Sequence, residues 1–174
     1  RILDELKAAG AHATFFVTGE NAERHPELLR RMVLEGHEIG NHTYSHPFMF
    51  KESSAERKDQ IARASAAIEE ACGVKVKYFR APYEYRDVRL VRLLHTMGLQ
   101  YTSHNVSSLD AMRAGEDKIV SQVVTKAHPG TIVLMHDARG NREATVQALP
   151  VALKQLKRMG YKAVTISNLK TAAQ

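Results

Sequence analysis

The sequence predicts an α/β fold in which helices and short strands alternate along the chain. Six glycines each follow a helical apolar pattern and precede a short apolar run: Gly10, Gly36, Gly73, Gly98, Gly130 and Gly160. Helices commonly end at such a glycine, because it adopts the left-handed conformation without a Cβ clash. This alternation implies parallel strands, in a barrel or a doubly wound sheet. The sequence has no glycine-rich phosphate loop, which favours the barrel.

The expected helices, in chain order, bury apolar residues spaced three or four apart. The first covers residues 2–9. The later helices present these apolar sets: Leu28, Leu29, Met32 and Val33; Ile61, Ala64, Ile68 and Cys72; Leu90, Leu94 and Met97; Ile119, Val120, Val123 and Val124; Val146, Leu149, Leu153 and Leu156.

Each expected strand is a short apolar run after one of the glycines. These strands cover residues 13–17, 38–40, 77–79, 99–102, 131–135 and 162–166. In barrels and in open sheets of this kind, functional side chains follow the C-terminal ends of the strands. Most of the chemically capable residues do follow them, so we expect one end of the fold to carry the chemistry.

Length and composition limit the possible classes of protein. The 174 residues predict a single domain over residues 1–174, and the globular composition contains no biased stretch. The net charge of +6 comes from scattered basic residues that rarely adjoin aromatics, which argues against a nucleic-acid partner. We also expect neither a membrane span nor a signal peptide within these residues. Cys72 is the only cysteine, so no internal disulfide is possible, and we expect a buried structural thiol.

His42 and His46 are candidate metal ligands. They follow the strand expected at 38–40, and two imidazoles four residues apart reach one cation if the loop turns helically. The pair alone is equally consistent with two polar loop histidines, because it lacks the helix and glutamate of the zincin motif. Its place after a strand favours a metal, and a third ligand is needed to complete a site.

Three further candidates also follow strands. Arg80 could hold an active-site carboxylate or make an ordinary ion pair, and Pro82 fixes the backbone two residues later. Asp110 could equally cap the next helix. His136 follows the most strand-like run of the chain, which suits a general acid because imidazole titrates near neutrality.

Four strings together resemble the polysaccharide deacetylase family, also known as the NodB-homology or carbohydrate esterase family 4 domain. They occupy residues 13–17, 36–46, 79–83 and 132–137, and the order and spacing agree over essentially the whole chain. The resemblance implies a distorted (β/α)7 barrel. It also implies a metal-dependent hydrolase that removes N-acetyl groups from chitin, chito-oligosaccharides or peptidoglycan.

The resemblance implies roles for eight residues. His42 and His46 would bind a divalent metal, most simply Zn, with Co, Ni or Mn as alternatives. Arg80 would hold the catalytic base, His136 would be the general acid, and Asp110 would orient it. The remaining three would bind substrate: the backbone N–H of Tyr83 would help bind the oxyanion, Leu134 would line the pocket for the acetyl methyl, and Pro82 would be a further substrate-binding residue.

The resemblance has departures. Residues 105–111 resemble the family's fourth motif, but Ser107 stands in place of its first aspartate and Ala111 in place of its tryptophan. Glu84 stands where a glycine often follows the tyrosine, here Tyr83. No aspartate pair matches the family's first motif, and the chain opens at Arg1 on a helical pattern. We therefore expect the natural chain to begin earlier, with its first strand outside these residues.

Two rival functions remain open. One is a non-catalytic sugar-binding relative that has lost the first motif. The other is a same-fold hydrolase of small cyclic amides, against which the H-T-x-S-H form of the histidine motif argues. By resemblance, the expected partner is an N-acetylated carbohydrate and the expected location is extracellular or in the cell envelope.

Overall fold

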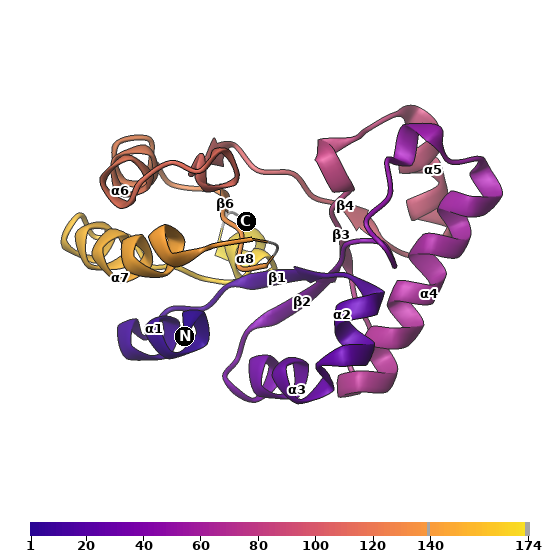
Figure 1. Ribbon diagram of the computed structural model, residues 1–174, viewed down its shortest axis with the longest axis horizontal. Coiled ribbons are helices and arrows are strands. Elements are labelled where there is room, and N and C mark those ends of the chain that lie inside the picture. Colours follow the sequence, from indigo (N-terminus) through magenta and orange to yellow (C-terminus); the bar gives the residue numbers. More distant parts are fainter. Residues whose placement is uncertain (139, 173–174) are drawn as a thin grey trace. The chain divides into compact units, whose positions relative to one another are not determined.

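The computed structural model describes residues 1–138 and 140–172 and divides the chain into two compact units (Figure 1). One unit is formed by residues 14–103. The other combines residues 1–13 with the chain from residue 104 onward.

The unit of residues 14–103 is built on a parallel four-stranded sheet. Its strands lie in the order β1 (Thr14–Val17), β2 (Glu38–Asn41), β3 (Tyr78–Phe79) and β4 (Gln100–Tyr101). The connecting helices are α2 (Gly19–Arg24), α3 (Pro26–Leu34), α4 (Ser54–Cys72) and α5 (Val88–Thr96), with short 3-10 turns η1 (Met49–Lys51) and η2 (Pro82–Glu84). The sequence order of the strands is also their order in the sheet, as right-handed parallel crossovers predict.

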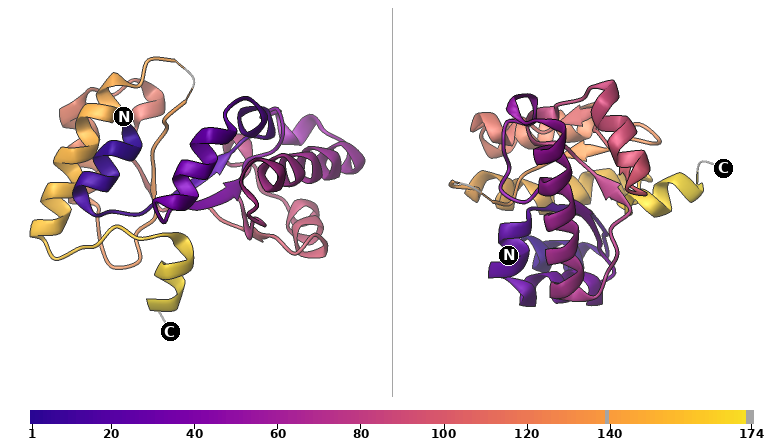
Figure 2. Two further views of the ribbon diagram at one scale, coloured as in Figure 1. Left: turned by 90° about the horizontal axis from the view of Figure 1, so that it is seen from below. Right: turned by 90° about the vertical axis from the view of Figure 1, so that its right-hand side faces the viewer.

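The longest helix of this unit, α4, packs against α2 and α3 (Figures 1 and 2). A capping box begins it: the Ser53 hydroxyl accepts from the Glu56 N–H, and the Glu56 carboxylate accepts from the Ser53 N–H. Gly73 ends it with φ 74°. Ile61 of α4 joins a buried apolar cluster with residues of η1, β3 and α5, so the sheet and helices share one core.

The second unit combines α1 (Ile2–Ala9), α6 (Glu116–Thr125), α7 (Glu143–Arg158) and α8 (Ile166–Ala172) with two short parallel strands. The strands are β5 (Val106–Ser107) and β6 (Val133–Leu134), and the 3-10 turn η3 (Asp110–Met112) follows β5. Helix α7 packs against both α1 and α6. Ile119, Val120 and Ala148 form the buried contact between α6 and α7.

The alternation of helices and parallel strands confirms the predicted α/β class. All six marker glycines have φ between 63° and 86°. Five of them end a helix as predicted, either as its C-cap or one residue after it: Gly10, Gly36, Gly73, Gly98 and Gly160. Gly130 does not, because α6 already ends at Thr125 with Lys126 as its C-cap. The observed strands are shorter than expected at 77–79, 99–102 and 131–135. No helix in the described part of the chain combines the length and apolar composition of a membrane span.

Two sequence-based assignments need correction. The strand expected at 162–166 is wrong, because residues 161–165 have no regular structure and Ile166 begins α8. A strand would need a ladder of hydrogen bonds to a neighbouring strand, whereas this segment accepts one backbone hydrogen bond, from the His12 N–H to Ala163 O at 3.1 Å. Conversely, Val106 and Ser107 form a strand where a loop was expected. Cys72 ends α4 half-buried, with its thiol donating to Ile68 O at 3.1 Å.

Candidate active site

The turn that carries His42 and His46 is organised by Asn41, the last residue of β2. Asn41 is fully buried, and its amide donates to Ile61 O at 2.8 Å and to Ser65 Oγ at 2.9 Å. Its Oδ1 accepts from the Thr43 N–H at 2.8 Å. The asparagine side chain therefore ties the turn to α4 through a fully buried group.

The turn also contains left-handed backbone. Thr43 has φ 66° and His46 has φ 61°, which are uncommon values for residues with a Cβ. Two side chains offset this cost by accepting three hydrogen bonds. Thr43 Oγ1 accepts from the His46 N–H at 3.1 Å, and Gln60 Oε1 accepts from the N–H groups of Tyr44 and Ser45, both at 3.0 Å. The loop is not the helical turn that the sequence suggested but an irregular turn that Gln60 of α4 holds in place.

The two imidazoles lie together. Their ring centroids are 4.9 Å apart at 77° between planes, and His42 Nδ1 lies 2.7 Å from Arg80 O. An imidazole that donates from Nδ1 to a carbonyl presents Nε2 as a lone pair, which is the usual arrangement of metal-binding histidines. Two imidazoles on a tetrahedral ion at about 2.0–2.1 Å would have centroids about 5 Å apart. The observed separation fits a shared metal ion.

A complete metal site needs more than this pair. Within the described residues, no three His, Cys, Asp or Glu side chains gather as a metal-binding group. Among the side chains that the structure describes, the pair therefore has no third His, Cys, Asp or Glu beside it that would complete such a site.

Arg80 follows β3 and contacts main-chain oxygens. Its guanidinium donates to Thr102 O at 3.4 Å and to Ser103 O at 3.2 Å, and it lies over the Phe16 ring at 4.2 Å. Burial lowers the pKa of Arg80 to about 10. No described carboxylate forms an ion pair with it, so the ordinary ion pair considered from the sequence is not present in this part of the chain. A buried guanidinium of this kind would be stabilised by a carboxylate.

The η2 turn directly follows Arg80. Pro82 is buried, whereas Tyr83 is 56% exposed. Tyr83 and Glu84 have φ of 54° and 58°, so two consecutive residues with side chains are left-handed, which costs about 1–3 kcal/mol each. The Tyr83 ring stacks on Phe48 at 4.2 Å with 11° between planes, and it meets the His46 ring edge-on at 4.9 Å.

In the other unit, the buried Asp110 pairs with the half-buried His136. The Asp110 carboxylate accepts from the His136 backbone N–H at 2.6 Å, and His136 Nδ1 lies 2.8 Å from Asp110 Oδ1. Thr145 Oγ1 donates to the same carboxylate at 3.1 Å. Burial raises the pKa of Asp110, but the hydrogen bonds and charge of His136 outweigh it and bring the pKa to about 2. The carboxylate is therefore ionised at neutral pH and fixes the orientation of the imidazole.

This contact excludes the other role considered for Asp110. The N-cap of α6 is Gly115, and Asp110 instead begins the short η3 turn. Its side chain is 2% exposed, and its carboxylate lies against the His136 imidazole and not at the start of α6. Leu134 lies in β6, two residues before His136, and is half-buried.

The structure thus gathers the predicted site residues in two groups. His42, His46, Arg80, Pro82 and Tyr83 surround one turn region of the unit of residues 14–103. Asp110, Leu134 and His136 lie together in the other unit.

Sequence reasoning missed Phe48, Phe50 and Arg57. Phe48 and Phe50 are 46% and 59% exposed, while Met49 between them is fully buried. The Phe-Met-Phe run directly after His46 and Pro47 was the available signal for an aromatic surface. Arg57 gave no signal, because an arginine in a charged helix is ordinarily solvated.

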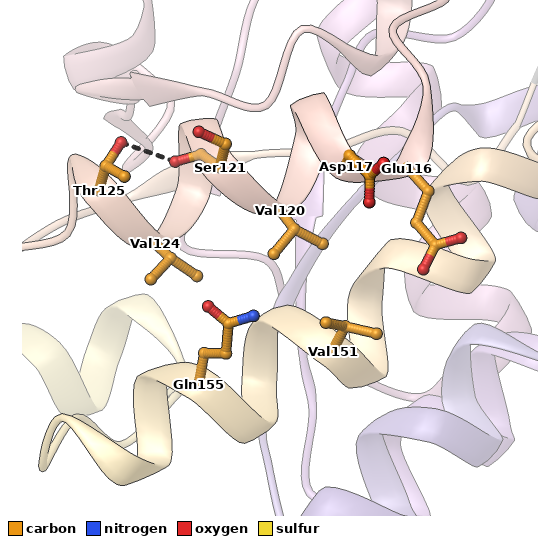
Figure 3. Close-up of a pocket in the computed structure, with 8 residues that line it drawn as sticks. All are labelled: Glu116, Asp117, Val120, Ser121, Val124, Thr125, Val151 and Gln155. Atoms are coloured by element: carbon orange, nitrogen blue, oxygen red, sulfur yellow. Dashed lines mark hydrogen bonds between the residues drawn. The ribbon is translucent and has the colours of Figure 1, made fainter.

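A separate hollow of about 340 Å³ lies between α6 and α7 (Figure 3). Val120 and Val124 line it from α6, and Val151 and Gln155 from α7. None of its lining residues is one of the predicted site residues, so it is a groove between helices, distinct from the site.

Comparisons with known proteins agree with these motifs. The family model described as polysaccharide deacetylase matches residues 1–102. The chain belongs to the polysaccharide deacetylase family. It is 33% identical to a peptidoglycan-N-acetylglucosamine deacetylase of Bacillus cereus, over 97% of this chain and 62% of that protein. It is 37% identical to a chitooligosaccharide deacetylase of a Bradyrhizobium species, over 92% of this chain and 78% of that protein. The chain thus spans less than two thirds of the Bacillus cereus relative.

Solved structures show that the fold is that of family 4 carbohydrate esterases. A peptidoglycan N-acetylglucosamine deacetylase solved with a hydroxamate ligand, 4-naphthalen-1-yl-N-oxidanyl-benzamide, has a TM-score of 0.93 and 33% identity, over 97% of this chain and 79% of that chain. A family 4 pseudoenzyme from Bacillus anthracis has a TM-score of 0.90 and 33% identity, over 97% of this chain and 58% of that one. The predicted NodB-type fold class is confirmed.

Proposed function

We propose that this family member is a metal-dependent deacetylase that removes N-acetyl groups from amino-sugar polymers or oligomers of the peptidoglycan or chitin type. The observation that carries the proposal is the His42 and His46 pair, whose rings converge while His42 Nδ1 lies within hydrogen-bonding distance of Arg80 O. The names of the deacetylase relatives support the substrate class. They also support a location in the cell envelope or outside the cell.

His42 and His46 would hold a divalent ion, most simply Zn²⁺. When bound there, such an ion supplies Lewis acidity for the acetyl carbonyl and lowers the pKa of water toward about 7. The left-handed Tyr83 backbone offers its N–H to the oxyanion. Arg80, buried beside main-chain oxygens, would hold a catalytic carboxylate in place by charge-assisted hydrogen bonds.

His136 would protonate the departing amine. Asp110 occupies the Nδ1 side of the imidazole, so Nε2 is the nitrogen that can deliver the proton. Leu134 would line the pocket for the acetyl methyl group, and Pro82 would bind substrate. These roles leave the sugar itself to be recognised by exposed residues around the histidine turn.

A non-catalytic sugar-binding function is the second candidate. It is favoured by the absence of a third metal ligand, and of a carboxylate on Arg80, within the described residues. The similar structure from Bacillus anthracis is named as a pseudoenzyme of carbohydrate esterase family 4, which supports a non-catalytic member.

The test measures acetate release and zinc binding by the full-length protein. We expect acetate from N-acetylated chito-oligosaccharides or peptidoglycan fragments, and a loss of zinc affinity of at least about tenfold in His46→Ala. His95→Ala, which removes an exposed histidine from α5, is the control. We expect His136→Ala to lower kcat by roughly 10²- to 10⁴-fold. Sugar binding without acetate release would instead establish the non-catalytic alternative.

A further inference from the structure

Arg57 is a buried arginine that links three segments of the unit of residues 14–103. It lies in the first turn of α4, and its side chain is 10% exposed. Its Nε donates to Met49 O at 2.9 Å, its Nη2 to the Tyr85 hydroxyl at 3.1 Å, and its Nη1 to Asp87 Oδ2 at 3.1 Å. Arginine side chains are seldom this deeply buried unless their N–H donors are paired with acceptors.

The partners of Arg57 are also bonded to each other. The Tyr85 hydroxyl donates to Asp87 Oδ2 at 2.5 Å, and Asp87 Oδ1 accepts from the Leu90 N–H at 2.6 Å, which caps α5. The guanidinium also lies over the Tyr85 ring at 5.0 Å. Arg57, Tyr85 and Asp87 therefore form a closed network, which we name the Arg57 clasp.

The Arg57 clasp contacts both segments that carry the stacked rings of Tyr83 and Phe48. Tyr85 and Asp87 directly follow Tyr83 and Glu84, the two consecutive left-handed residues. On the other side, Met49 directly follows Phe48, the residue on which the Tyr83 ring stacks. Arg57 thus bonds the neighbours of both members of the stack.

Strained backbone persists only where its surroundings determine it. Other contacts also restrain this segment: Pro82 is buried, and the Tyr101 hydroxyl donates to Tyr85 O at 3.3 Å and to Glu84 O at 3.4 Å. Within the turn, the Glu84 N–H donates to Ala81 O at 3.3 Å and the Tyr85 N–H donates to Pro82 O at 3.2 Å. The clasp provides the contacts of the Tyr85 side chain and holds the loop that carries Phe48. Without it, Tyr83 would lose the fixed partner for its ring and the anchor immediately after the turn.

We infer that Arg57 is a positioning residue for deacetylation, which holds the Tyr83 backbone N–H in the left-handed conformation that presents it to the oxyanion. This inference rests on the proposed function, because it assumes that role for the Tyr83 N–H. A contact that acts only in the transition state changes kcat more than KM. A purely structural ion pair between α4 and the start of α5 would change stability alone.

The experiment compares Arg57→Met with Lys58→Met in the full-length protein. Lys58 is exposed on the same helix, so both variants remove one positive charge from adjacent positions. We expect Arg57→Met to lower kcat about 10- to 100-fold, with KM within about threefold of the wild type. We expect Lys58→Met to match the wild type in both constants.

Two further variants keep the test decisive if Arg57→Met folds poorly. Arg57→Lys keeps the charge but cannot make the three directed contacts, so we expect it to recover stability better than kcat. Tyr85→Phe removes the two hydrogen bonds of the Tyr85 hydroxyl but leaves those from Arg57 to Met49 O and Asp87, and we expect a smaller fall in kcat. Amide hydrogen exchange at residues 83–85 provides a readout independent of catalysis, and we expect it to be faster in all three variants than in Lys58→Met.

The outcomes separate this inference from the proposed function. A folded Arg57→Met protein with wild-type kcat, or with unchanged exchange at residues 83–85, would overturn the positioning role while leaving deacetylation intact. If the activity of Arg57→Met falls only in proportion to the fraction of the protein that is unfolded, the clasp stabilises the fold and has no positioning role. No acetate release by the wild type would instead refute the proposed function, and with it the oxyanion role on which this inference rests.

Discussion

The Asp110 carboxylate should make the stability of this protein depend on pH in the acid range. Its pKa is about 2 in the folded chain, against 3.8 for an ordinary aspartate. A depressed pKa contributes stability that is fully present above the unfolded value and is lost as pH falls through the folded value. The difference corresponds to roughly 2.5 kcal/mol, with about 1 kcal/mol already lost at pH 3.

The perturbation is Asp110→Asn, which preserves the shape of the side chain and removes its charge. Urea unfolding followed by circular dichroism at pH 7 and pH 3 gives the free energy of unfolding of both proteins. We expect the deficit of the variant to be about 1 kcal/mol smaller at pH 3 than at pH 7, because Asp110 takes up a proton over this range in the unfolded wild-type chain but stays largely ionised in the folded one. Asp117→Asn removes an exposed carboxylate from α6 of the same unit and controls for charge alone.

A deficit that is equal at both pH values would refute this reasoning, since the ionised carboxylate would then not be the stabilising species. The same variant should also lower kcat, because the asparagine NH2 group or oxygen cannot reproduce both contacts with His136. If stability shifts as expected while kcat stays at the wild-type value, Asp110 would be a structural partner of His136 without a role in orienting an acid.

Two further predictions concern the histidine turn and the sheet beneath it. Gly40→Ala should cost about 1–3 kcal/mol of unfolding free energy, because its Cβ would lie 2.6 Å from the Phe16 ring, whereas Gly115→Ala, where a Cβ meets nothing within 4 Å, should cost less. Equal costs in urea titrations would exclude the close approach as the cause. Asn41→Ala should cost roughly 1–3 kcal/mol and weaken zinc binding, because it leaves the Thr43 N–H without its buried acceptor. Calorimetric zinc affinity equal to that of the wild type would show that the turn forms without the asparagine.

Much of the fold could be predicted because it depends on local backbone preferences. Gly10, Gly36 and Gly73 mark helix ends wherever the chain must adopt positive φ, and this requirement is present in the sequence itself. The strand at 162–166 could not be judged in this way. An apolar run becomes a strand only if a neighbour supplies a ladder of hydrogen bonds, and in the described residues this segment receives one bond, from His12 to Ala163.

For the candidate site too, some assignments could be made from the sequence and others needed the folded chain. His42 and His46 could be proposed from their spacing and from their place after a strand, and the family from the strings around them. The sequence left Asp110 open between a helix cap and a partner of His136, because both roles suit an aspartate in that position. Only the folded chain decides, since the residues of that pair are 26 positions apart.

The sequence by itself thus determined the α/β class, the family and the residues able to do the chemistry, because these follow from local conformational preference and from motif chemistry. The tertiary structure decided how those residues are held. Arg57 looks like a solvated helix arginine in the sequence, yet the fold buries it against Met49, Tyr85 and Asp87. Its partners come from two other segments of the chain, so its role depends on packing, which no single stretch of sequence encodes.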